Sequence, residues 1–166
     1  RRVQDSFPVC GIHDCSRVDY TSTGFRIAGA RDFFVDVRVY NDGVAGGTGK
    51  ISLDNPSSQV LYGSGNFGNL ELVQGEVDLA GNPTINGSLT TLSGDLRVLD
   101  HTLTLNGPSI QGAATNMHTT LGSSLVFGGD VAGVQIPASV AQLKSLTLNN
   151  SHGANLNTGL TLAGSL

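Results

Sequence analysis

Short apolar–polar–apolar segments recur along much of this sequence at a constant spacing. Turn residues such as Gly75, Gly94 and Gly107 separate them. The leading apolar residues fall into two groups with a step of seven residues inside each group: Leu70 and Val77, then Leu89, Leu96, Leu103 and Ile110. An alternating segment places one set of side chains inward and the other outward. Strands this short and this closely spaced cannot form long hairpins.

The spacing predicts an all-β fold, a right-handed parallel β-helix or solenoid with three short faces and about 20–22 residues per coil. Stacked coils pair their strands in parallel and bury one continuous apolar column, so stability is a sum over neighbouring coils. We expect such coils over residues 69–110 and 143–166. The predicted inward residues are Leu70, Leu72, Val77, Leu79, Leu96, Val98, Leu103, Leu105, Leu146 and Leu148.

Two regions differ in composition. Residues 43–166 hold the repeats, and we expect them to continue beyond the C-terminus because the last residues stop inside a strand pattern. Residues 1–42 hold both cysteines and most of the arginines. We expect this segment to be an N-terminal cap or a connection from an earlier domain, since an open coil exposes apolar core and unpaired strand edges.

The strand triplets carry a resemblance to a known class. Residues 136–150, with their Leu-Thr-Leu triplet and Asn turn, and residues 160–166 resemble the repeats of large secreted Bacteroidetes surface proteins. Residues 63–72 resemble the start of the same repeats, and the likeness covers roughly residues 50–166. It implies an extracellular, cell-surface or type IX-secreted protein, often adhesive. Its partners would be cell-surface or secretion-machinery components, glycans or other cells.

The two cysteines allow two interpretations. Cys10, His13 and Cys15 offer three metal ligands, whereas a structural zinc site needs four, and no fourth ligand is evident nearby. A Cys10–Cys15 disulfide that closes a tight loop suits a secreted chain. We expect the disulfide, and we expect no metal and no other cofactor.

The charge distribution excludes some partners. Formal net charge is -4, and after residue 38 the cations are Lys50, Arg97 and Lys144. Nucleic-acid binding needs clustered Lys and Arg to neutralise phosphates, so we expect no nucleic-acid role. The sequence contains no long apolar run, so we expect no membrane insertion.

One group of charged residues is a candidate surface contact for an ion or a glycan: Asp78, Asp95, Arg97 and Asp100. With coils of about 21 residues, Glu76 would stack near Arg97 and Asp78 near Asp100. Adjacent outward carboxylates could bind calcium or share a proton. The alternative is a solvated face with an ordinary ion pair, which we favour because the repeats carry so few cations. We therefore expect no catalytic residues.

Three functions remain open. We favour a structural or adhesive solenoid that acts by shape and surface display and is not an enzyme. A carbohydrate-active β-helix enzyme would need a groove with facing carboxylates. A glycan- or ice-binding module on the same scaffold would need a flat ladder of regularly spaced threonines. The sequence shows such residues in patches, at Thr84, Thr90, Thr104, Thr147 and Thr161.

Overall fold

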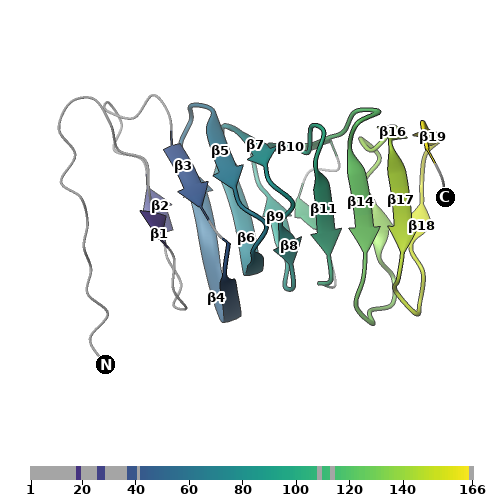
Figure 1. Ribbon diagram of the computed structural model, residues 1–166, viewed down its shortest axis with the longest axis horizontal. Coiled ribbons are helices and arrows are strands. Elements are labelled where there is room, and N and C mark those ends of the chain that lie inside the picture. The colour runs from purple at the N-terminus through teal and green to yellow at the C-terminus, as the bar shows by residue number, and fades with distance from the viewer. Residues whose placement is uncertain are drawn as a thin grey trace.

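The described chain is all-β and contains no helix. The computed structural model describes residues 18–19, 26–28, 37–40, 42–107, 110–112 and 115–164. Their strands pair in parallel and stack into a β-solenoid of about six turns. In Figure 1 the strands follow one another in chain order along the long axis. The predicted all-β parallel solenoid is therefore confirmed.

The strands are short, and most have five residues or fewer. In chain order they are β1 (Val18–Asp19), β2 (Arg26–Ala28), β3 (Val37–Tyr40), β4 (Val44–Asp54), β5 (Gln59–Tyr62), β6 (Asn66–Gln74), β7 (Glu76–Ala80), β8 (Thr84–Ile85), β9 (Leu89–Thr91), β10 (Asp95–Arg97), β11 (Thr102–Leu105), β12 (Ile110–Gly112), β13 (Met117–His118), β14 (Ser124–Phe127), β15 (Gln135–Ile136), β16 (Gln142–Leu143), β17 (Ser145–Leu148), β18 (Asn155–Leu156) and β19 (Thr161–Leu162).

The pairing arranges these strands into faces of the solenoid. A six-stranded sheet, in the order β1-β3-β5-β7-β10-β13, forms one face. A nine-stranded sheet forms the other two, because its long strand β6 pairs with β8 through its first residues and with β9 through its later ones. From there one face continues as β8-β11-β14-β17 and the other as β9-β12. The last coils add the pairs β15-β18 and β16-β19.

The number of residues per coil varies around the predicted value. Val44 is the register partner of Asn66, a step of 22 residues. Asn66 is in turn the register partner of Thr84, a step of 18 residues. These steps follow from strands and corners of unequal length. The varying step decides which outward side chains become neighbours in adjacent coils.

The interior is a continuous apolar column. The predicted inward residues that are buried are Leu70, Leu72, Val77, Leu79, Leu96, Val98, Leu103, Leu105 and Leu146. Phe67 and Phe127 are the largest side chains in this column. Burying one such side chain contributes about 1.5–3 kcal/mol, so the column is the main favourable term in the stability of each coil.

The prediction for Leu148 is wrong, because this side chain is 45% exposed. Its register partner Phe127 is 1% exposed. Phe127 lies in β14, which has paired strands on both sides, whereas β17 is the edge strand of the described sheet. Burial in a solenoid depends on the next coil as well as on alternation, and no described coil covers Leu148.

Corners where backbones of successive coils touch require glycine. A Cβ atom at Gly107 would overlap the carbonyl oxygen of Gly87, one coil earlier. Gly75 has a φ of +76° and faces the carbonyl oxygen of Asn55. Gly75 therefore combines the left-handed conformation that favours glycine with a contact that leaves no room for a side chain.

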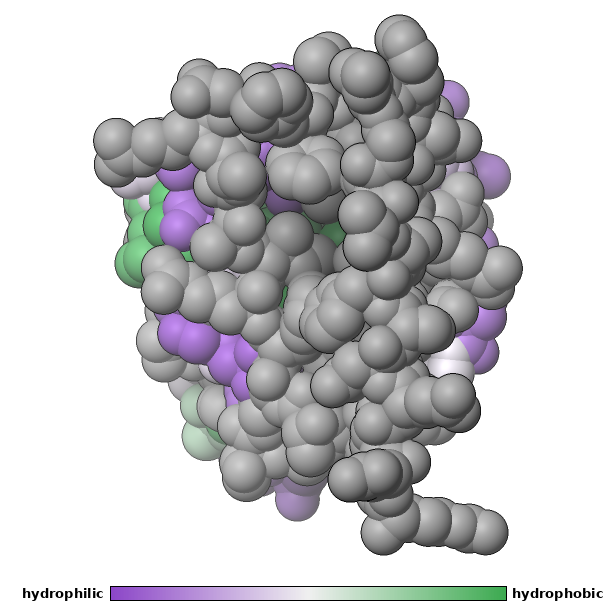
Figure 2. All heavy atoms as spheres, turned by 90° about the vertical axis from the view of Figure 1, so that its left-hand side faces the viewer, coloured by the Kyte–Doolittle hydropathy of each residue, from purple (hydrophilic) through white to green (hydrophobic). Residues whose placement is uncertain are grey.

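The structure describes only part of the predicted N-terminal segment, residues 1–42. Strands β1, β2 and β3 pair in parallel with later strands, so the parallel sheets begin before residue 43. That residues 1–42 cap the solenoid stays a prediction, since most of that segment lies outside the described residues. Cys10 and Cys15 also lie outside them. Seen along the long axis, the described residues present hydrophilic groups at several places around the outline (Figure 2).

Candidate binding faces

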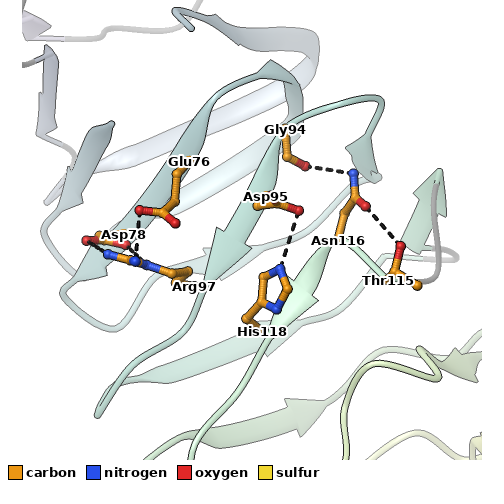
Figure 3. A network of polar contacts seen from close by, with 8 residues as sticks. All are labelled: Glu76, Asp78, Gly94, Asp95, Arg97, Thr115, Asn116 and His118. Carbon is orange, nitrogen blue, oxygen red and sulfur yellow. Dashed lines mark hydrogen bonds and ion pairs between the residues drawn. The ribbon is translucent and has the colours of Figure 1, made fainter. Parts of the chain in front are cut away.

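The first candidate surface is made by the outward side chains of β7, β10 and β13, and we call it the charged face. The register places Asp78 beside Arg97, and Arg97 beside His118. Glu76 lies beside Asp95 in the neighbouring column. Figure 3 shows these side chains pointing toward one another from successive coils. The charged face therefore brings together most of the residues that the sequence singled out.

Arg97 is the centre of this cluster. Its Nε and Nη2 atoms donate to the two carboxylate oxygens of Asp78, each at 2.5 Å. Its Nη1 atom lies 2.8 Å from Oε1 of Glu76. The hydrogen bond to Asp78 is the main cause of a raised pKa for Arg97, and the charges of Asp78 and Glu76 raise it further. Two-point pairing of this kind fixes geometry as well as charge.

The other predicted members of the cluster have different partners. Asp95 Oδ1 lies 3.4 Å from Nε2 of His118. Asp100 lies in a separate corner, where its Oδ1 accepts a 3.5 Å hydrogen bond from the hydroxyl of Thr120. The expected stacking of Asp78 on Asp100 is wrong, because the coil from β7 to β10 has a step of 19 residues and pairs Asp78 with Arg97. The expected proximity of Glu76 and Arg97 is confirmed.

The second candidate surface is made by the outward side chains of β8, β11, β14 and β17, and we call it the uncharged face. None of these four strands contains a charged or an aromatic residue at an outward position. The outward residues form two columns. One column is Thr102, Ser124 and Ser145, and the other is Thr84, Thr104, Val126 and Thr147.

Hydrogen bonds between coils order this face and its border. The hydroxyl of Ser145 donates to the hydroxyl of Ser124 at 2.9 Å. Along the border, Nδ2 of Asn106 donates to Oδ1 of Asn86, also at 2.9 Å. The corners before β11 and β17 carry His101 and Lys144, so ionisable groups flank the face without entering its strands.

The register explains why the threonines looked patchy in the sequence. Thr84, Thr104 and Thr147 share one column, in which Val126 takes the remaining position. Thr90 pairs with Glu71 in β6, and Thr161 pairs with Gln142 in β16, so both belong to other faces. The sequence showed that several strands resemble one another. Only the pairing register showed which of their threonines lie in one column.

A polar corner joins residues that the sequence did not connect. The hydroxyl of Ser151 donates to Oδ1 of Asp130, and Nδ1 of His152 lies 3.1 Å from the same oxygen. The hydrogen bond from Ser151 is the main cause of a lowered pKa for Asp130, with the charge of His152 second. Ser151 also contacts Nδ1 of His152. A Ser-His-Asp relay needs the two ring nitrogens to face different partners, so this arrangement does not form one.

We also searched the described residues for a metal site, a membrane-spanning helix and a ligand cavity. No group of three or more His, Cys, Asp or Glu residues there is placed to hold a metal ion. The described segments also include no helix of the length and apolarity needed to cross a membrane. A void between Leu89, Leu105 and Phe127 measures about 10 Å³, which is no larger than a water molecule needs.

Comparison with known proteins gives no relative for this chain: no family model matches it, and no curated protein or solved structure is significantly similar to it. The resemblance of its repeats to secreted Bacteroidetes surface proteins therefore stays a prediction from the sequence.

Proposed function

We propose that this chain is an extracellular structural and adhesive solenoid of a cell-surface or secreted protein, which acts by its shape and by the surface it displays. The observation that carries the proposal is the uncharged face. Four stacked strands present only threonine, serine and valine at their outward positions, and all of their other side chains except Leu148 fill the core. A regular face without charge suits contact with an extended surface better than capture of a small ion.

The solenoid supplies a rigid support for such a face. Each added coil lengthens the stack by roughly 4.8 Å, the spacing of hydrogen-bonded strands. Each coil contacts only its neighbours, so length can grow without a larger core. A rod of this kind can hold an adhesive surface at a distance from a cell, and the repeat resemblance makes cell-surface and secretion-machinery components its expected partners.

The residues of the charged face pair with one another across coils. Glycan hydrolysis or elimination needs acid and base groups that face a substrate. Arg97 already engages both neighbouring carboxylates, Asp78 through two hydrogen bonds and Glu76 through an ion pair. The cluster thus links successive coils. We propose that no residue of it is catalytic.

Adhesion under flow tests the proposed function. Beads coated with the chain should be retained on cell or glycan surfaces, and Thr104→Lys should reduce retention because it places a charge in the middle of the uncharged face. Thr90→Lys, the same substitution on another face, is the matched control and should leave retention unchanged. Cleavage of a polysaccharide by the chain, abolished by Asp78→Asn or Asp100→Asn, would instead establish an enzyme.

A further inference from the structure

We propose that the uncharged face binds the ordered water lattice of an ice surface. This inference rests on the proposed adhesive role of that face and names its ligand. It uses three properties of the face: the spacing of its outward groups, the stiffness of its side chains, and the absence of charged and aromatic residues from its outward positions.

The spacing forms a nearly rectangular grid. Adjacent coils stack at about 4.8 Å, and outward residues along a strand are separated by about 6.6 Å, twice the rise per residue. In the grid, Thr102 and Thr104 occupy one coil, Ser124 and Val126 the next, and Ser145 and Thr147 the one after. The spacing between coils is close to the shorter repeat of oxygen atoms on the prism plane of hexagonal ice, and the spacing along a strand is somewhat below the longer repeat. A face with this grid can hold a layer of water in positions that continue the crystal.

The side chains are stiff enough to keep the grid. Threonine and valine are branched at Cβ, which restricts rotation about χ1. Each threonine offers a methyl group beside a hydroxyl group, so it can both exclude disordered water and bond to ordered water. Ser124 and Ser145 are held by the hydrogen bond between their hydroxyls. Val126 keeps the branched shape of threonine at its position in the second column and lacks one hydroxyl.

The composition of the face separates ice from other partners. Ammonium groups are strongly hydrated, and a charged face would therefore impose its own arrangement of water. Sites for soluble ligands are concave and rich in apolar and aromatic side chains, whereas the outward positions of these strands hold Thr, Ser and Val. The charged face has the same strand spacing but carries Glu76, Asp78 and Arg97, and it provides an internal comparison.

Incorporation into slowly growing ice tests the proposal. Fluorescently labelled wild-type chain should concentrate in the ice rather than in the remaining liquid. Thr104→Lys should lower this enrichment about tenfold, equivalent to about 1.4 kcal/mol, and Thr90→Lys should leave it unchanged. Val126→Thr, which restores a hydroxyl to the column, should match or exceed wild type. Thr147→Lys, at an exposed position of β17, is a second disruptive variant, and circular dichroism checks the fold of each.

Two results would overturn the proposal. One is exclusion of the wild-type chain from ice, and the other is equal enrichment of folded Thr104→Lys and Thr90→Lys. Sedimentation with insoluble cellulose and chitin provides the other arm. Binding there that Thr104→Lys abolishes, without enrichment in ice, would assign the face to a polysaccharide lattice. That result would support the adhesive function and contradict ice as its ligand. Loss of retention on every surface would count against the adhesive function itself.

Discussion

The charged face and the uncharged face are built on the same scaffold and differ outward. Inward, β10 contributes Leu96 and β14 contributes Leu125, and both side chains are fully buried. Outward, β10 presents Asp95 and Arg97, whereas β14 presents Ser124 and Val126. Alternation along a strand therefore lets the two surfaces be specified separately. The inward residues determine the fold, and the outward residues are free to determine what the face contacts.

The two faces also link successive coils in different ways. On the charged face, Arg97 joins the coil of β10 to Glu76 and Asp78 of the coil before it. On the uncharged face, the link between side chains is the hydrogen bond of Ser145 to Ser124. Ion pairs link the coils but leave charged groups on the surface. The hydroxyl link leaves the surface neutral, which is what the proposed contact with a lattice requires.

The largest expected effect is a loss of stability from core substitutions, and it should be similar behind both faces. Leu96→Ala and Leu125→Ala should each lower the free energy of unfolding by about 2–5 kcal/mol, because each leaves a cavity in the column. Urea denaturation followed by circular dichroism measures both. Leu148→Ala, at a half-exposed position, is the control and should cost much less. A large difference between Leu96→Ala and Leu125→Ala would show that the two faces differ in their core as well.

The sequence predicted the core better than the surface, for a physical reason. Alternation sets inward direction locally, so residues such as Leu103 and Val77 could be placed from their neighbours alone. Burial of Leu148 would also require a further coil packed against it, and the alternation of residues along a strand contains no information about that coil. The partner of Asp78 depended on the length of the corners between coils. A step of about 21 residues placed Asp78 near Asp100, and the actual step of 19 residues pairs Asp78 with Arg97.

The uncharged face was recognisable only in part. The strands Thr102–Leu105 and Ser145–Leu148 look alike in sequence, but their alignment across the strand between them required the pairing register. Thr90 looked equally suitable and belongs to another face. Surface columns in a solenoid are relations between distant residues, so composition alone does not identify them.

The next largest effect should be confined to the charged face. Arg97→Gln removes the cation between Glu76 and Asp78, and we expect a loss of about 0.5–1 kcal/mol in the free energy of unfolding, as for partly exposed ion pairs. The loss should shrink in about 1 M salt, where screening acts within about 3 Å. Arg97→Lys should recover part of it, since an ammonium cannot reproduce the two-point pairing. If Arg97→Gln leaves the free energy of unfolding unchanged at low salt, the ion pairs of the charged face do not stabilise the contact between coils.

A smaller effect is expected from the uncharged face. Thr104→Val keeps the branched shape and removes an outward hydroxyl, so the free energy of unfolding should change by no more than about 0.5 kcal/mol. Thermal and urea unfolding measure this. A loss comparable to that of Arg97→Gln would mean that the hydroxyls hold the coils together. The hydroxyl groups of the uncharged face would then be explained by their contribution to stability, without a ligand.

The smallest effect concerns the corner that follows β14, beside the uncharged face, and it should depend on pH. Asp130 is well exposed, and the hydrogen bond from Ser151, with the charge of His152, lowers its pKa in the folded chain. A lowered pKa contributes stability that is present above the unfolded value of about 3.9 and is lost as pH falls through the folded value. Wild type should therefore melt slightly above Asp130→Asn at pH values well above that unfolded value. The difference should disappear on acidification below the folded pKa. Melting curves across this range test the sign, because a difference that grows as the pH falls would contradict a lowered pKa.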